Sequence, residues 1–347
     1  MTGERNLTPV NVLTGFLGSG KTTLLQRMLR SPALRRTAVL INEFGEVGLD
    51  HLLVQPVDDA VVLLESGCIC CTIRGDLTRA LLGLLGRRER SEIPYFDRVV
   101  IETTGLADPG PILYTLLSEP VVRHHFRLGN VIATVDAANA DLHLSRNPEG
   151  IKQVAAADRL VVTKTDLVAP EQSAVVHATL ARLNPSAEVC DARDEALDID
   201  ELLEVRPATH SGERSQRYWF LPAASDVEAT GLGDALRRHG TEVSSLSLIL
   251  DEPLDWTAFG IWLSMLLNRH GNDVLRVKGM LAVQGMDTPV LVNGVQHIVH
   301  PPQHLERWPT EDHRSRLVFI TRGIDRERLL RSLEACCGAR VAEHAAA

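Results

Sequence analysis

Short apolar runs separated by polar and turn residues recur through the first half of the chain. They cover residues 10–13, 38–41, 61–64, 99–101, 131–135 and 160–162. Each has the length of a buried strand, and helical patterns lie between several of them, as at residues 22–29 and 77–85. This alternation predicts an α/β domain with a mostly parallel sheet covered by helices. In such sheets ligands bind outside the carboxyl ends of the strands, so residues directly after the runs are the first functional candidates.

The second half of the chain has a different pattern. Residues 206–216 lose apolar content and gain polar and turn residues, which indicates a linker. We therefore predict a first α/β domain over residues 1–207, a linker over 208–241 and a smaller α+β domain over 242–340. The elements predicted in the second domain are strands at 246–250, 274–283, 290–299 and 317–321 and helices at 257–267 and 326–336. The tail from Gly338 is predicted to be frayed.

Composition and charge narrow the class of protein. The chain has 347 residues and a formal net charge of −9, without a block of Lys and Arg, so we expect no nucleic-acid partner. Residues 1–9 lack the apolar core of a secretory signal, and no run approaches the roughly 20 apolar residues of a membrane span. These patterns predict a cytoplasmic protein with no membrane partner. In a reducing compartment, clustered cysteines are more often metal ligands or redox groups than disulfides.

The first apolar run leads into a complete G-x-x-x-x-G-K-[ST] motif over residues 15–22. The glycines of such a P-loop let backbone N–H groups and the N-terminus of the next helix face nucleotide phosphates. We expect the amine of Lys21 to reach the β and γ phosphates and the hydroxyl of Thr22 to ligate Mg²⁺. The strand before the motif and the helical pattern after it favour this interpretation over a chance glycine-rich loop.

The apolar run at 99–101 delivers an acidic residue, Glu102, and then Gly105. In P-loop hydrolases a carboxylate at this position supports Mg²⁺ or its water, and a glycine N–H can sense the γ-phosphate. The alternative is a strand that ends in a solvated glutamate. The intact P-loop favours the catalytic interpretation.

The run at 160–162 is followed by Thr163-Lys164-Thr165-Asp166. This segment is similar to the guanine-specificity motif N-K-x-D of GTPases, with Thr163 in place of Asn. An aspartate at the last position accepts hydrogen bonds from guanine that adenine cannot supply, and an unpaired carboxylate would reject ATP. The segment therefore predicts GTP and GDP as the nucleotides.

A cysteine cluster, Cys68, Cys70 and Cys71, follows the run at 61–64. Such thiolates suit Zn²⁺. Successive side chains of extended backbone alternate sides, so only two of the three thiolates are assured to one ion, and other ligands must complete the site. The nearest candidates are Glu43 and Glu46, and a carboxylate shared with the Mg²⁺ network would couple the two sites. Buried packing of the cysteines and a solvated loop for the glutamates remain the alternatives.

The weaker metal candidates are the other cysteines and several histidines, namely Cys190, Cys336, Cys337, His124, His125, His297, His300 and His304. We expect the cysteines to pack. Solvated side chains are favoured for the last three histidines, because Pro301 and Pro302 break any helical face there. The first two histidines could reach a metal, although a surface position is favoured for them as well.

Together these segments resemble the CobW-like GTPases, a group of metal chaperones related to hydrogenase- and urease-accessory GTPases, and among them the bacterial zinc chaperones. The resemblance rests on the motifs above and on residues 42–46, 102–111, 277–281, 293–296 and 317–320, which cover nearly the whole chain. It implies a slow GTPase that binds Zn²⁺, or Co²⁺ or Ni²⁺, through the C-x-C-C residues and hands the ion to a client apo-metalloprotein. Many relatives carry a metal-ligating Glu where this chain has Ile41, which puts any auxiliary metal site in question.

The resemblance also assigns roles to individual residues. Catalysis falls to Lys21, Thr22 and Glu102, of which Thr22 ligates Mg²⁺. Those implied to hold the nucleotide are Gly15, Gly18, Ser19, Gly20, Lys21, Thr22, Thr23, Gly105, Thr163, Lys164 and Asp166. Those implied for the transferred metal are Cys68, Cys70, Cys71 and Glu46, and Glu43 stays a candidate from its position alone.

The leading hypothesis is therefore a metallochaperone in which GTP hydrolysis is coupled to metal binding and release. Two other classes compete with it. One is a non-enzymatic metal store or sensor with a structural nucleotide site, and the other is a P-loop kinase or ATPase with a structural metal. The sequence leaves open whether the chain forms a homo-oligomer.

Overall fold

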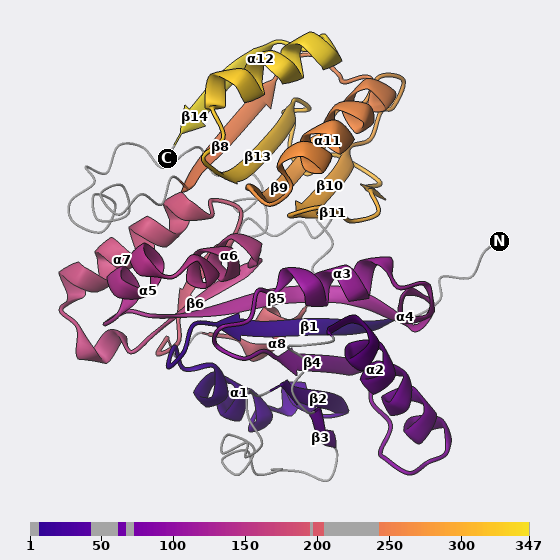
Figure 1. Ribbon diagram of the computed structural model, residues 1–347, viewed down its shortest axis with the longest axis vertical. Helices are drawn as coiled ribbons and strands as arrows, with labels where there is room; N and C mark the ends of the chain where they lie inside the picture. The colour runs from indigo at the N-terminus through magenta and orange to yellow at the C-terminus, as the bar shows by residue number, and fades with distance from the viewer. Residues whose placement is uncertain (1–6, 43–61, 67–72, 195–196, 205–242, 347) are drawn as a thin grey trace.

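The computed structural model describes residues 7–42, 62–66, 73–194, 197–204 and 243–346. Within these ranges the chain forms two sheets of opposite kinds (Figure 1). The first has the order β3-β2-β4-β1-β5-β6-β7, and its described strand pairs are all parallel. Its strands are β1 (Thr8–Gly15), β2 (Thr37–Asn42), β3 (Val62–Ser66), β4 (Arg98–Glu102), β5 (Phe126–Asp136), β6 (Arg159–Thr163) and β7 (Glu188–Asp191). The predicted α/β class is confirmed.

The described residues of all six predicted apolar runs lie in strands, residue 61 being outside the described ranges, and β7 is the one described strand of this sheet that the pattern missed. Only Val189 and Cys190 are apolar in β7, which lies at an edge of the sheet. The helices of this domain are α1 (Lys21–Leu29), α2 (Ile73–Glu89), α3 (Gly110–Ser118), α4 (Pro120–His125), α5 (Ala140–Arg146), α6 (Pro148–Ala156), α7 (Pro170–Leu183) and α8 (Ile199–Leu203). The two predicted helical patterns correspond to α1 and α2.

The strands of the first sheet are apolar on both faces because helices cover both. On β2, Ala38 packs toward α2 and α3, whereas Val39 packs with α1 and α8 on the opposite face. Neighbouring side chains of a strand alternate in this way, so a continuous apolar run is what a sheet buried on both sides requires.

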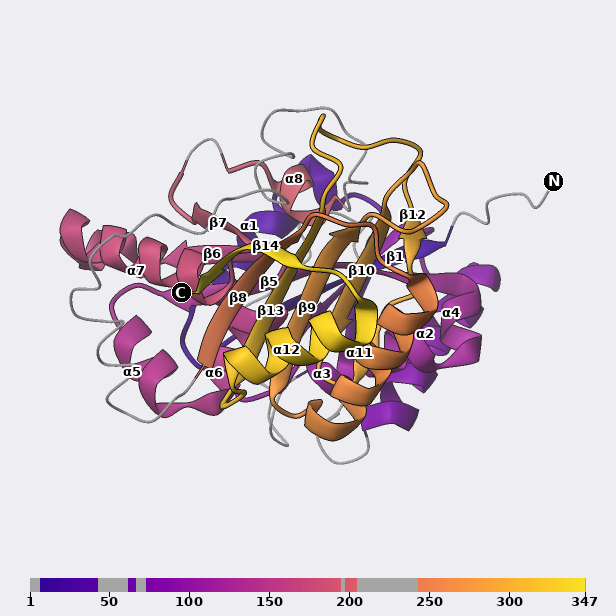
Figure 2. The same cartoon turned by 90° about the horizontal axis from the view of Figure 1, so that it is seen from above.

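The second sheet is antiparallel and confirms the predicted α+β unit. Its order is β11-β10-β9-β13-β8-β14, with β12 paired to β10. The elements are β8 (Val243–Leu250), α11 (Trp256–His270), β9 (Val274–Leu281), β10 (Val290–Val295), β11 (Ile298–Val299), β12 (Gln303–His304), β13 (Ser315–Arg322), α12 (Arg326–Cys337) and β14 (Val341–Ala346). The side chains of Asp255 and Asp325 cap α11 and α12 by accepting backbone N–H bonds. Both helices cover the same face of this sheet (Figure 2).

Two predictions for the secondary structure of the second domain are wrong. Residues 290–299 do not form one strand, because the chain turns back at Gln296 and β10 pairs with β11, with Val295 opposite Ile298. The φ of Gln296 is 53°, as two-residue hairpin loops demand of their central positions. The tail is not frayed either, since β14 pairs with β8 and satisfies backbone groups that would otherwise form an open edge.

The face of the second sheet opposite α11 and α12 packs on α3, α6 and α7 of the first domain (Figure 1). Val295 and Ile298, from the β10–β11 hairpin, join the apolar core around α3. Leu275 and Ile320 join the core around α6. Side chains of the second domain therefore complete the core of the first, and an apolar interface of this kind couples the two domains mechanically.

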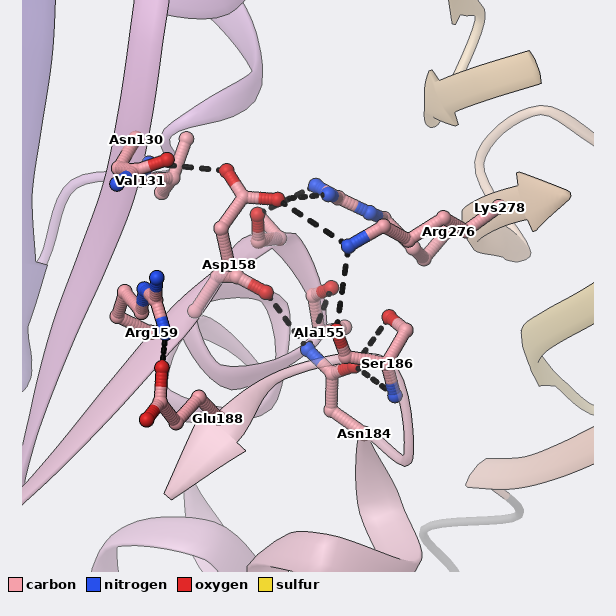
Figure 3. A network of polar contacts seen from close by, with 12 residues as sticks. Asn130, Val131, Ala155, Asp158, Arg159, Asn184, Ser186, Glu188, Arg276 and Lys278 are labelled. Carbon is pink, nitrogen blue, oxygen red and sulfur yellow. Dashed lines mark hydrogen bonds and ion pairs between the residues drawn. The ribbon is translucent and has the colours of Figure 1, made fainter. Parts of the chain in front are cut away.

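A polar network lies within this interface (Figure 3). The carboxylate of Asp158, just before β6, accepts a hydrogen bond from Arg276 of β9 and lies 3.9 Å from the amine of Lys278. Its second oxygen accepts the N–H of Val131 at 3.0 Å. Arg276 is 1% exposed and also donates to the carbonyl of Ala156, at the end of α6. Burial alone would raise the pKa of Asp158, but the two cations hold that pKa below its usual range.

The helices of the described part of the chain include none both long and apolar enough to cross a bilayer.

Candidate nucleotide and metal site

The P-loop joins the central strand β1 to α1, as the motif predicts. Gly20 precedes the first residue of α1, and no acidic residue occupies the first turn of that helix. The partial positive charge at the helix N-terminus therefore faces the loop without an internal counter-charge. A buried hydrogen bond of 2.6 Å between the hydroxyls of Ser19 and Thr134 anchors the loop to β5. Gly18 and Thr23 are exposed beside it.

Lys21 lies over the loop rather than in solvent. Its amine donates to the carbonyls of Gly15, at 2.9 Å, and Phe16, at 3.1 Å. These bonds hold a single positive charge at the mouth of the loop, and the side chain is largely buried. An ammonium held at this point suits phosphate oxygens better than a mobile surface lysine would, because less conformational entropy is lost on binding.

Thr22 and Glu102 meet where α1 begins and β4 ends. The Thr22 hydroxyl donates to Oε1 of Glu102 at 2.9 Å. The register of the sheet brings them together, because Glu102 pairs with Leu13 of β1, shortly before the loop. Glu102 is 4% exposed. A hydroxyl and a carboxylate at one point next to a phosphate-binding loop are the oxygen donors that Mg²⁺ prefers, so the residues present fit this ion.

Gly105 lies directly against the P-loop. A Cβ at this position would lie 2.6 Å from the backbone nitrogen of Leu17, so a side chain has no room there. Gln153 of α6, 1% exposed, holds the segment by donating from Nε2 to the carbonyls of Gly105 and Ala107, at 3.1 and 3.0 Å. Sequence reasoning missed Gln153, since a glutamine inside a helix carries no signal of its partner.

The guanine-motif segment is tied to the P-loop by the residue that departs from the motif. Thr163 donates from its hydroxyl to the carbonyl of Ser19 at 2.7 Å, in a buried position. The threonine at this position thus provides a hydrogen bond between β6 and the phosphate loop. Asp166, three residues after Thr163, is half exposed and lies 3.8 Å from Arg193. Its carboxylate is therefore accessible to the guanine base of a nucleotide.

Lys164 is oriented by a carboxylate that the sequence analysis did not single out. Its amine donates to Asp136, at the end of β5, at 2.7 Å. Burial alone would raise the pKa of Asp136, but hydrogen bonds from Lys164, Asn139 and the N–H of Ala138 hold that pKa below its ordinary value. Asp136 directly follows an apolar run, as Glu102 does, and the same rule would have found it.

The predicted metal ligands Glu43, Glu46, Cys68, Cys70 and Cys71 lie outside the described residues. The strands that lead to them are described, and they are neighbours. In the parallel pair β2–β3, Asn42 pairs with Ser66, and in the pair β2–β4, Ile41 pairs with Glu102. Across residues 7–42, 62–66, 73–194, 197–204 and 243–346, no group of three or more His, Cys, Asp and Glu side chains could hold a metal.

Ile41 is buried in the core beside α1. Its side chain packs with Leu24 and Leu25 on the face away from α2. Position 41, where the family resemblance implied a glutamate in many relatives, is therefore an ordinary core position in this chain.

The weaker cysteine candidates mostly pack, as predicted. Cys190 and Cys337 lie in apolar clusters, where burial raises the pKa of each thiol to about 11. Cys336, in contrast, is exposed, because it lies on the solvent side of α12.

Among the histidines, His124 and His125 are exposed just before β5 begins. They therefore lie at the amino ends of the strands, whereas the P-loop lies at the carboxyl ends. His297 and His304 are exposed, as predicted. The expectation of a solvated His300 is wrong. The Nε2 atom of its ring is buried, and this burial, with the positive charge of Arg276 adding to it, lowers the pKa of His300 to about 4.

A parallel sheet whose central strand enters a P-loop, with Glu102 delivered beside Thr22, defines a P-loop nucleotide-binding protein. The chain belongs to the CobW/HypB/UreG family: the model of its nucleotide-binding domain matches residues 9–191. The cobalamin synthesis protein cobW C-terminal domain matches residues 243–337.

Several named proteins are similar over most of their length. The chain is 35% identical over 311 residues to "Zinc chaperone YjiA" of Escherichia coli, which covers 90% of this chain and 93% of that protein. It is 30% identical to "Zinc chaperone CobW" of Pseudomonas aeruginosa, covering 94% and 90% of the two chains. The crystal structure of zinc-bound YjiA GTPase from E. coli superposes with a TM-score of 0.68 at 30% identity, covering 96% of this chain and 99% of that one.

Proposed function

We propose that this protein is a GTP-hydrolysing metallochaperone, which binds Zn²⁺, or Co²⁺ or Ni²⁺, and hands it to a client apo-metalloprotein. The observation that carries the proposal is the strand order β3-β2-β4-β1. In the sequence, the cysteine segment follows β3, the segment with Glu43 and Glu46 follows β2, and the P-loop follows β1, while Glu102 is the last residue of β4. Because the carboxyl ends of parallel strands lie at the same end of a sheet, the four strand ends that carry or precede these motifs lie side by side.

The proposed nucleotide chemistry follows from the residues at the carboxyl ends of β1 and β4. The P-loop backbone and the amine of Lys21 bind the phosphates, and Thr22 with Glu102 would hold Mg²⁺, which when bound neutralises negative charge on the β and γ phosphates. The Gly105 N–H contacts the γ-phosphate, and this contact is lost when the phosphate leaves. Hydrolysis in this scheme depends on positioning and electrostatic stabilisation, with no covalent enzyme intermediate.

Guanine specificity is assigned to Asp166. Replacing it by Asn is expected to lower the affinity for GDP about 100-fold and to leave the weak affinity for ADP within about threefold, because only guanine donates to this carboxylate. Titration of fluorescent GDP and ADP measures both values. The exposed Asp194 follows Arg193, the residue that lies 3.8 Å from Asp166, and offers the same substitution as a control. Equal affinities of the Asp166→Asn variant and the wild type for GDP would contradict the assignment.

Metal coupling is assigned to ligands shared between the two loops. Cys68, Cys70 and Cys71 supply thiolates, and Glu43 and Glu46 supply carboxylates. The strand that leads to the two glutamates, β2, pairs with β4, and Ile41 lies opposite Glu102. When the γ-phosphate is lost, movement of the segment with the two glutamates would withdraw a carboxylate from the thiolate-bound ion. The ion would then pass to the client.

The test is a phosphate-release assay with and without one equivalent of Zn²⁺. Wild-type turnover is expected to change at least threefold on adding Zn²⁺, whereas Cys70→Ser and Cys71→Ser hydrolyse GTP at the metal-free rate in both conditions. Cys336→Ser, a substitution of an exposed cysteine on α12, is the matched control and should respond as the wild type does. Turnover unaffected by Zn²⁺ in every protein would contradict coupling, and absence of GTP hydrolysis with tight Zn²⁺ binding would favour a metal store.

A further inference from the structure

A turn of the second domain contacts the segment that carries Gly105. Gln296, between β10 and β11, donates from Nε2 to both carboxylate oxygens of Asp108, at 3.0 and 3.1 Å. The turn lies so close to the start of α3 that a Cβ at Gly110 would lie 2.5 Å from Oε1 of Gln296. The two domains thus touch within a few residues of the predicted γ-phosphate contact.

Asp108 is also held from the first domain. Its carboxylate accepts the amine of Lys152 at 2.7 Å and the N–H of Gly110 at 2.9 Å. Lys152 precedes Gln153 on α6, and Gln153 holds the carbonyls of Gly105 and Ala107. Side chains of α6 therefore hold the segment of residues 105–110 at several points, and Gln296 of the second domain holds the same segment through Asp108.

The helix α6 is itself a rigid support (Figure 3). The side-chain amide of Asn184 donates to the carbonyls of Val154, Ala155 and Ala157, which satisfies the C-terminal end of α6. Arg276 of the second domain donates to the carbonyl of Ala156 at 2.6 Å. The second domain thus contacts this arrangement at two points. Gln296 binds the segment of residues 105–110, and Arg276 binds the C-terminal end of α6.

The backbone at Gln296 gives independent support. Its φ of 53° lies in the left-handed region, which costs an ordinary residue roughly 1 kcal/mol and glycine or asparagine less. Packing of the hairpin is supplied by Val295 and Ile298, so it does not require a long amide at this position. The side chain that occupies the strained position is the one that reaches Asp108, which is the pattern expected of a functional constraint.

We infer that Gln296 is a positioning residue for GTP hydrolysis, through which the second domain sets the placement of the Gly105 N–H against the γ-phosphate. This inference rests on the proposed function, since it requires GTP at the P-loop. GDP, which lacks the γ-phosphate, does not depend on Gln296. By linkage, GTP binding and any partner that moves the β10–β11 turn affect each other to the same extent.

The experiment replaces Gln296 by Asn and, separately, by Glu. Asparagine adopts a positive φ readily and is one methylene shorter, so it loses Asp108 without added backbone strain. Glutamate keeps the size of glutamine and replaces the donor by a second carboxylate. For both variants we expect kcat for GTP and the affinity for a non-hydrolysable GTP analogue to fall about tenfold, because a donor to the γ-phosphate is displaced. The affinity for GDP should stay within twofold.

His297→Ala is the matched control in the same turn. The ring nitrogens of His297 contact Leu267 and Asn272, both in the second domain, so this variant should bind both nucleotides as the wild type does. A parallel loss of GDP affinity in the Gln296 variants would indicate a structural role and overturn the inference. Wild-type values in both variants would overturn it as well, provided that the wild type hydrolyses GTP. A wild type without hydrolysis would refute the proposed function itself.

Discussion

Replacing Glu102 by Gln is expected to slow GTP hydrolysis by about 10²–10³-fold. Glutamine retains an oxygen that can accept the hydrogen bond from the Thr22 hydroxyl, which is 2.9 Å long to Oε1 in the wild type. The junction of α1 and β4 should therefore keep its shape. What is lost is the negative charge that would hold Mg²⁺ and order its water. Since Glu102 is 4% exposed, a neutral amide is also less costly to bury than the carboxylate, and the melting temperature should not fall.

Phosphate release at saturating GTP, measured across a Mg²⁺ titration, checks this expectation. The variant should need more Mg²⁺ for half-maximal GTP binding, while hydrolysis stays slow even at saturation. Glu92→Gln, the control, makes the same exchange at an exposed position shortly before the first residue of β4. It should leave hydrolysis unchanged. Hydrolysis by Glu102→Gln within about threefold of the wild-type rate at every Mg²⁺ concentration would exclude Glu102 from the reaction.

The sequence predicted much of the fold because its signals are local. A strand buried on both faces must be apolar throughout, and each predicted run of the first domain meets that condition. The prediction failed for elements that form through pairing with distant strands and have no apolar pattern of their own. β7 has two apolar residues and depends on its pairing with β6, β14 depends on β8, and the turn at Gln296 interrupts a run whose apolar residues continue on either side.

The candidate site divides in the same way. Lys21, Thr22 and Glu102 belong to motifs whose spacing is fixed by one loop or strand, and the structure brings them together at the end of β1 and β4. Gln153, Asp108 and Gln296 have no such spacing, because their contacts join α6, the segment before α3 and a turn of the second domain. Pairings of this kind depend on how the two domains pack, and a single sequence does not encode that packing as a local pattern.

The interface between the domains leads to the second large effect. Asp158→Asn is expected to lower the free energy of unfolding by about 3–5 kcal/mol, because it leaves the buried guanidinium of Arg276 without its carboxylate. Asparagine preserves the acceptor for the Val131 N–H, 3.0 Å away in the wild type, so the loss reports the charge. Urea denaturation at pH 7 measures it, and Asp251→Asn, which removes an exposed partner of Arg314, provides a control with an expected change of about 0–1 kcal/mol.

The pH dependence separates this charge effect from a packing defect. Burial lowers the pKa of Lys278 to about 8, and Asp158 opposes that shift, so without Asp158 the pKa of Lys278 falls further. Between pH 7 and 9 the unfolded Asp158→Asn chain then binds more protons at Lys278 than the folded one, and its stability rises with pH more steeply than that of the wild type. The deficit should therefore shrink at pH 9. Adding Arg276→Met should restore part of the lost stability, since an apolar side chain needs no counter-charge. A deficit that is the same at both pH values and unrelieved by Arg276→Met would mean that Asp158 stabilises the interface by its shape alone.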